Sequence, residues 1–87
     1  MLLRDYLAEW DPMGFITDLG APQDEYGLEA ADIKLKYRAG LSDEAIAALV
    51  YAVFCDRMET ELPALLAECK KRASAIRDIL QTDNFGL

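Results

Sequence analysis

Apolar residues recur at intervals of three and four along most of this chain, the spacing that places side chains on one face of a helix. The pattern predicts one helix over residues 2–10, a second over 24–39, a third with Ser42 as its N-cap and a fourth with Thr60 as its N-cap. The sequence contains neither the strict alternation of a β-strand nor an internal repeat. Its 87 residues suit one domain. We therefore predict an all-α fold, a single four-helix domain over residues 1–87.

The third predicted helix is uncharged through its middle. Every residue from Ala45 to Cys55 lacks a charge. A helix that is apolar on all sides is normally buried by its neighbours. We therefore expect this helix to be the centre of the domain, with the first and last helices covering it.

The stretch Trp10-Asp11-Pro12-Met13-Gly14 is predicted to end the first helix, because the residue before a proline is held out of the α region. Trp10 shares a face with the apolar residues of that helix and is predicted to anchor it to the core. The alternative is that Trp10 is an exposed binding contact. Asp11 is predicted to cap the Met13-Gly14 turn, and Asp24 to be the N-cap of the second helix.

Acidic residues are concentrated in the first third of the chain. The net charge is −7, and residues 1–32 hold eight acidic residues and one basic residue, whereas the remaining residues balance. The negative electrostatic potential of these residues repels nucleic acid and anionic membranes and attracts a basic protein. The alternative is an acidic face that only keeps the protein in solution. The predicted partner-binding residues are Asp18, Asp24, Glu25, Glu29 and Asp32.

The side chains that most catalytic and metal sites require are scarce. The chain has no histidine, which excludes the usual serine and cysteine triads, and it has no glycine-rich phosphate loop. Cys55 and Cys69 lie in apolar helical patterns and are predicted to be reduced core residues. Oxygen ligands for Ca²⁺ are present among the acidic residues, but their spacing matches no calcium loop. We therefore expect no enzyme activity, no cofactor and no metal.

The N-terminal residues and the length of the apolar runs indicate where in the cell the protein is expected. Charges interrupt the start of the chain before an apolar run long enough for a signal peptide develops. No apolar run approaches the roughly 18 residues that span a bilayer. Together with the two reduced cysteines, these features predict a cytoplasmic protein that binds no membrane.

The unusual N-terminal residues resemble the hallmark of the small bacterial YugE-like domains of unknown function. In that family a W-D-P-hydrophobic-G motif is followed by P-x-D-E-Y-x-x-E. The matching residues here are Trp10 to Gly14, Ala21-Pro22, Asp24-Glu25-Tyr26 and Glu29.

The resemblance covers roughly residues 5–57. Ser42-Asp43-Glu44 and the apolar run from Ile46 to Phe54 occupy the place of the family's next helix. The chain departs from the family at Gly27, where a polar residue is more usual, and the likeness fades in the last helix. The resemblance implies a compact helical domain of the bacterial cytoplasm, and it implies no activity.

These observations predict a small non-enzymatic protein-binding module. Its small size and localised negative charge suit an immunity protein or inhibitor that neutralises a bacterial toxin through an acidic surface. The expected partner is a basic protein, either a toxin or a nucleic-acid-processing enzyme, and not nucleic acid itself. The alternatives are a phage-type nucleic-acid mimic and a self-associating housekeeping domain. The protein itself is expected to be a monomer or a weak homodimer.

Overall fold

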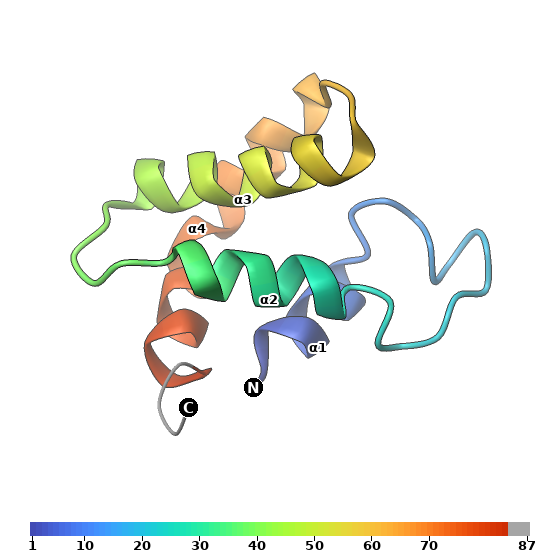
Figure 1. The fold of residues 1–87 in the computed structure, drawn as a ribbon, viewed down its shortest axis with the longest axis horizontal. Helices are drawn as coiled ribbons and strands as arrows, with labels where there is room; N and C mark the ends of the chain where they lie inside the picture. The colour runs from blue at the N-terminus through green and yellow to red at the C-terminus, as the bar shows by residue number, and fades with distance from the viewer. Residues whose placement is uncertain (84–87) are drawn as a thin grey trace.

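The computed structural model describes residues 1–83, and these fold into four α-helices (Figure 1). The helices are α1 (Leu3–Trp10), α2 (Gly27–Lys36), α3 (Asp43–Met58) and α4 (Pro63–Asp83). No strand occurs within residues 1–83, so the predicted all-α class is confirmed. The end of the chain, where a tail with Phe85 and Leu87 was predicted, lies outside the described residues.

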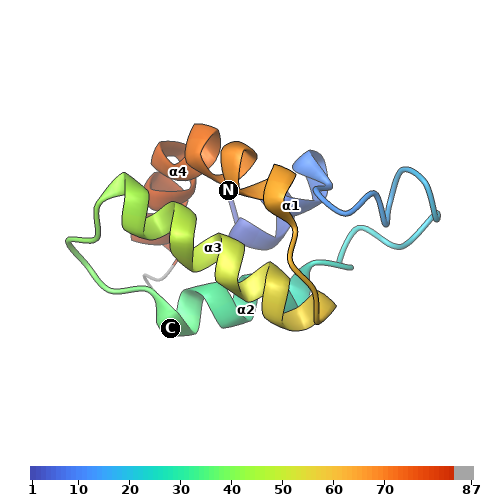
Figure 2. The same cartoon turned by 90° about the horizontal axis from the view of Figure 1, so that it is seen from above.

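The helices pack in a closed ring around one core. Each helix contacts the next along the chain, and α1 also contacts α4, while α3 and α4 form the most extensive pair (Figures 1 and 2). The stripe predicted for the first helix is confirmed, because Leu3 and Leu7 are fully buried. The other fully buried large side chains are Tyr26, Ile33, Ile46, Val50, Val53, Phe54, Cys69, Ile76 and Leu80.

Helix α3 buries one face and exposes another. Ile46, Val50 and Phe54 are fully buried, whereas Ala48 and Ala52 are exposed. The expectation that this helix is covered on all sides is therefore wrong. An uncharged run does not require burial when its outward positions are alanines, since alanine suits an exposed helix surface.

The predicted helix caps were correct at one helix and wrong at two. The Ser42 hydroxyl accepts a hydrogen bond from the Ala45 N–H at 3.1 Å, which confirms Ser42 as the N-cap of α3. Asp24 does not cap α2, because residues 22–26 form turns and the helix begins only at Gly27. Thr60 does not cap α4, which begins at Pro63, the position where a missing N–H costs nothing.

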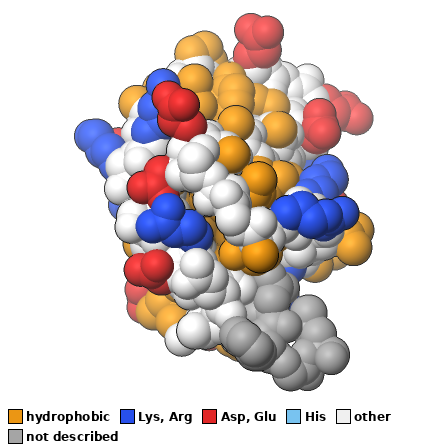
Figure 3. Space-filling model, turned by 90° about the vertical axis from the view of Figure 1, so that its left-hand side faces the viewer, with side chains coloured by type: hydrophobic (Ala, Val, Ile, Leu, Met, Phe, Trp, Pro, Cys, Tyr) orange, Lys and Arg blue, Asp and Glu red, His pale blue; other side chains and the backbone are white. Residues whose placement is uncertain are grey.

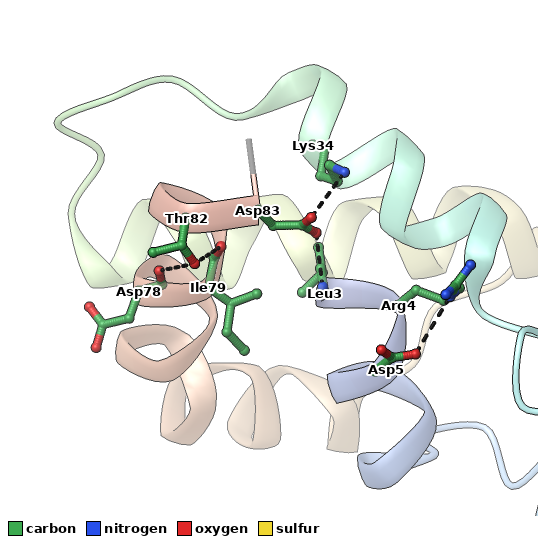
Figure 4. Close-up of polar contacts among 8 residues, drawn as sticks. All are labelled: Leu3, Arg4, Asp5, Lys34, Asp78, Ile79, Thr82 and Asp83. Atoms are coloured by element: carbon green, nitrogen blue, oxygen red, sulfur yellow. Dashed lines mark hydrogen bonds and ion pairs between the residues drawn. The ribbon is translucent and has the colours of Figure 1, made fainter. Parts of the chain in front are cut away.

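The last described residue ties three helices together. One carboxylate oxygen of Asp83 accepts a hydrogen bond from the N–H of Leu3 at 2.9 Å, and the other lies 3.4 Å from Lys34 Nζ (Figure 4). The Asp83 side chain is almost fully buried. A negative charge at the start of α1 also suits the positive end of that helix. Asp83 therefore joins the end of α4 to both α1 and α2.

Replacing Asp83 by alanine is expected to lower the free energy of unfolding by about 2 kcal/mol, because it leaves a helix N–H and a lysine without their acceptor. Urea denaturation measures the loss. Asp78→Ala is the matched control on the same helix, since Asp78 is exposed, and it should change stability by less than about 0.5 kcal/mol. Equal losses in the two variants would show that Asp83 has no special structural role.

None of the helices within residues 1–83 combines the length and the apolar character that crossing a membrane requires.

Candidate functional site

The segment that connects α1 to α2, residues 11–26, projects from the helices as a loop (Figures 1 and 2). We call it the acidic loop, because it carries three exposed carboxylates, those of Asp18, Asp24 and Glu25. Leu19 lies among them and is 75% exposed. The acidic loop therefore exposes one large apolar side chain and three carboxylates.

A buried tyrosine closes the acidic loop at its base. The Tyr26 hydroxyl donates a hydrogen bond to Asp11 Oδ1 at 2.5 Å and accepts one from the Met13 N–H at 3.1 Å. The Tyr26 ring is fully buried, stacks on Phe15 and meets Phe54 edge-on, with ring centroids 5.7 and 6.0 Å away. The two ends of the loop are thus joined to each other and to the core. We call the Asp11–Tyr26 pair the clasp.

Asp11 also organises the first turn of the acidic loop. Its carboxylate accepts hydrogen bonds from the N–H groups of Ile16 at 3.2 Å and Thr17 at 2.8 Å. Asp11 was expected to cap the Met13-Gly14 turn. That expectation is wrong, because the Met13 N–H donates to the Tyr26 hydroxyl and the Gly14 N–H donates to the Asp11 backbone carbonyl. Asp11 itself adopts the left-handed conformation (φ 52°) that aspartate tolerates.

The clasp shifts the pKa values of both partners. Desolvation acts to raise the pKa of Asp11, but the hydrogen bonds from Tyr26, Thr17 and Ile16 outweigh it and hold that pKa well below its usual range. Burial, and then the hydrogen bond to Asp11, raise the pKa of Tyr26 well above its usual value. The carboxylate is therefore ionised and the phenol protonated at neutral pH, as the short hydrogen bond requires.

Gly14 holds Asp18 close to the base of the acidic loop. Gly14 has a φ of 71°, and the Asp18 N–H donates to its carbonyl at 2.8 Å. A Cβ at position 14 would lie 2.6 Å from Asp18 Oδ2. Only glycine therefore permits both this backbone conformation and this approach of the carboxylate.

An apolar hollow of about 410 Å³ lies beside the base of the acidic loop. It forms where the Trp10-Asp11-Pro12-Met13 corner meets the start of α4. Two carboxylates, those of Glu61 and Glu68, belong to its wall. The other lining residues are Trp10, Pro12, Met13, Leu62, Pro63, Ala64 and Leu65.

Trp10 takes part in both the core and the hollow. It is half-buried, and its ring meets Phe54 edge-on at 6.4 Å, which confirms it as a core anchor. The Arg72 guanidinium lies 4.7 Å from the ring centroid and 3.9 Å from a Glu68 carboxylate oxygen. One side of the indole is therefore already covered by a cation, while the ring still lines the hollow.

The five predicted partner-binding residues do not share one surface. Asp18, Asp24 and Glu25 are exposed on the acidic loop. Asp32 lies on α2 and is half-buried between Lys36 and Arg57, at 3.5 and 3.8 Å. Glu25, Glu29 and Asp32 do not lie on one helix face, because α2 starts at Gly27, after Glu25.

Glu29 is the clearest departure from the expected acidic face. It is only 7% exposed, and its Oε1 has no hydrogen-bond partner within the described residues. Glu29 shares the inward face of α2 with Tyr26 and Ile33, and Leu28 points outward instead. Glu29 therefore cannot contact a partner in this conformation.

Replacing Glu29 by methionine is expected to stabilise the protein by about 1 kcal/mol, because it removes a buried carboxylate oxygen that lacks a partner and keeps a similar volume. Thermal or urea unfolding measures the gain. The same change at exposed Glu25 serves as the control and should have little effect. A clear loss of stability in Glu29→Met would mean that Glu29 makes a favourable polar interaction.

Sequence reasoning missed Leu19 and the hollow. The sequence around Leu19 could have indicated its exposure. Leu19 lies between an aspartate and a glycine in a turn region, so no helix or strand pattern places it on a buried face. No local sequence pattern indicates the hollow, since its two halves lie about fifty residues apart in the chain and meet only through folding.

Two observations bear on metal binding and nucleophilic chemistry within residues 1–83. No group of three or more acidic or cysteine side chains within residues 1–83 could hold a metal ion. Burial raises the pKa of the Cys69 thiol to about 12, with smaller contributions from Cys55 and Glu68, so that this thiol is a poor nucleophile. What the acidic loop and the hollow can do is bind: they combine carboxylates, an exposed leucine and an apolar recess.

Comparisons with family models, with curated proteins and with solved structures found no match to this chain. The resemblance to the YugE-like domains stays a prediction.

Proposed function

We propose that this protein is a small non-enzymatic binding module that neutralises a basic protein through the acidic loop. The simplest role of this kind is that of an immunity protein or inhibitor for a bacterial toxin. The observation that carries the proposal is the clasped, projecting loop, which bears the exposed carboxylates of Asp18, Asp24 and Glu25 and an exposed Leu19.

The clasp supports a role in recognition. A loop that is fixed before binding loses less conformational entropy when its partner arrives. Asp11 holds the loop in place through its hydrogen bonds with Tyr26, Ile16 and Thr17. The exposed carboxylates of the loop are not needed for these contacts. Carboxylates of this kind speed association with a basic surface and select against acidic partners.

The hollow supports a mixed polar and apolar contact. Its apolar walls suit a large aliphatic or aromatic side chain, and Glu61 suits a neighbouring lysine or arginine on the same segment. A basic toxin or nucleic-acid-processing enzyme presents such side chains around its active site. The partner is therefore expected to be anchored in the hollow and steered by the acidic loop.

The nucleic-acid mimic is the weaker alternative. A mimic needs carboxylates spaced like phosphates along one surface. Glu29 is buried and Asp32 is ion-paired, so only three of the five proposed carboxylates lie free on the loop. A bacterial, cytoplasmic location belongs to the same proposal, and the two unpaired cysteines suit a reducing compartment.

The proposal is tested by capturing the partner from the bacterial host with tagged protein and measuring Kd at low and high salt, about 50 mM and about 500 mM. We expect a Kd below about 1 μM at low salt and at least tenfold weaker binding at high salt. A partner whose affinity is indifferent to salt, or a host that yields no partner at this affinity, would contradict the proposal.

A further inference from the structure

The outer face of α2 is apolar although it faces solvent. Leu28 and Leu35 are 66% and 75% exposed. They lie seven residues apart, which is two turns, so that they project from the same side of the helix. Ala31 lies between them and is exposed as well. We call these three residues the α2 stripe.

The opposite side of α2 is also apolar, because Tyr26, Ala30 and Ile33 are buried in the core. Single exposed leucines are common on protein surfaces, but two that align on a ten-residue helix form a continuous stripe. A helix that is apolar on two opposite sides is typical of one that is covered on both. Residues 1–83 cover only the inner side.

Charges lie at the two ends of the α2 stripe with opposite sign. Asp24 and Glu25 are exposed just before the helix, and Lys36 and Arg38 are exposed at its end. Figure 3 shows the face of the molecule on the far side from the acidic loop, where hydrophobic side chains gather in the middle and both basic and acidic side chains lie around them. A complementary surface must therefore be apolar in the middle, basic at one end and acidic at the other.

We propose that a second copy of this chain covers the α2 stripe, with the two α2 helices antiparallel. In this arrangement Leu28 of each copy lies near Leu35 of the other. Glu25 of each copy meets Lys36 of the other, so that both ends pair opposite charges. A parallel arrangement would bring like charges together at each end. A twofold axis relates the two copies, as in most homodimers.

A smaller hollow of about 190 Å³ widens the surface beside the stripe. Ala31 and Leu2 line it together with Arg4 and with Lys34, which pairs with Asp83. Leu2 is itself 45% exposed. This hollow extends the apolar contact beyond α2.

The interface is small. Helix α2 has ten residues and is about 15 Å long, so the buried area falls at the low end for protein pairs. The dimer is therefore expected to be weak and concentration-dependent. It does not rest on the proposed function, but it shares Asp24 and Glu25 with the acidic loop, so that dimer formation and binding of a basic partner compete.

Sedimentation equilibrium of the full chain from about 10 μM to about 1 mM tests the proposal. We expect a reversible monomer–dimer equilibrium that Leu28→Gln/Leu35→Gln weakens at least tenfold. Leu19→Gln is the matched control, because Leu19 is as exposed as Leu35 but lies on the acidic loop, and it should leave the equilibrium unchanged. Circular dichroism checks that each variant keeps its helices.

A charge exchange tests the antiparallel geometry. Glu25→Lys alone and Lys36→Glu alone should each weaken the homodimer, because each places like charges at both ends. Mixing the two variants should restore dimers, since every end then pairs opposite charges. A chain that stays monomeric at about 1 mM, a dimer that survives Leu28→Gln/Leu35→Gln, or a mixture without recovery would each overturn the proposal. Failure of the proposed function is recognised separately, since the Leu28/Leu35 variant should still bind the basic partner.

Discussion

Reversing the charge of Asp24 and Glu25 together, as Asp24→Lys/Glu25→Lys, is expected to weaken binding of the basic partner by about 100-fold, or about 2.7 kcal/mol. Both carboxylates are exposed on the acidic loop, and neither makes an ion pair within the described residues. The loss should fall mostly on the association rate, because long-range attraction steers the encounter. Stopped-flow or surface-plasmon kinetics at two salt concentrations separate the rates.

The control for this variant changes the net charge by the same amount elsewhere. Asp56 and Asp78 are exposed near the end of α3 and on α4, and Asp56→Lys/Asp78→Lys should weaken binding far less. Both measurements are made at concentrations where the protein is monomeric. Equal losses in the two variants would mean that net charge alone governs binding and that the acidic loop is not the contact surface.

Removing the Tyr26 hydroxyl is expected to open the acidic loop and to lower the free energy of unfolding by about 1–3 kcal/mol. Tyr26→Phe keeps the buried ring against Phe15 and Phe54, but it leaves the Met13 N–H without its acceptor and Asp11 without its shortest hydrogen bond. Amides of residues 11–26 should exchange faster with solvent. Tyr37→Phe is the control, because Tyr37 is half-buried at the other end of α2 and its hydroxyl makes no hydrogen bond in residues 1–83.

The clasp also predicts how stability depends on pH. The pKa of Asp11 is lower in the folded protein than the value of about 4 expected when unfolded, so its contribution is complete above about pH 4. The contribution is lost as the pH falls through the folded pKa, because protonation removes the charge that Tyr26 stabilises. The stability difference between the native protein and Tyr26→Phe should therefore narrow below about pH 4. A difference that stays constant to pH 2 would show that the carboxylate form of Asp11 is not what the hydroxyl stabilises.

The parts of the fold that depend on neighbouring residues were predictable from the sequence. Leu3 and Leu7 recur at helical spacing and are buried. Ser42 caps α3 by accepting a hydrogen bond from the Ala45 N–H, three residues later. These features depend only on residues close together in the sequence, so residue type and spacing determine them. The four-helix, all-α class follows from the same periodicity.

Helix α2 shows why the acidic face was harder to predict. Its apolar residues lie on two opposite sides, so periodicity alone does not say which side faces the core. The prediction placed Glu29 outward, whereas the fold buries Glu29 and exposes Leu28 and Leu35. The start of the helix is likewise fixed by a distant contact, because Tyr26 must reach Asp11 at the other end of the loop.

The Trp10-Asp11-Pro12-Met13-Gly14 stretch has a structural role at the base of the acidic loop. Trp10 packs on the core, Asp11 forms the clasp, and Gly14 accommodates Asp18. Pro12 and Met13 then line the hollow with residues from the start of α4. The motif predicts a turn at the end of the first helix from the sequence alone. The hollow beside it forms only when segments that are distant in the chain come together.

Hydrogen exchange of the free protein and of its complex with the captured partner tests the central claim most directly. If the clasped acidic loop is the binding surface, amides of residues 14–25 and 61–65 should become protected in the complex, while the exposed face of α3 around Ala48 and Ala52 should be unchanged. Protection confined to α3 and α4, with the acidic loop exchanging as in the free protein, would contradict the claim.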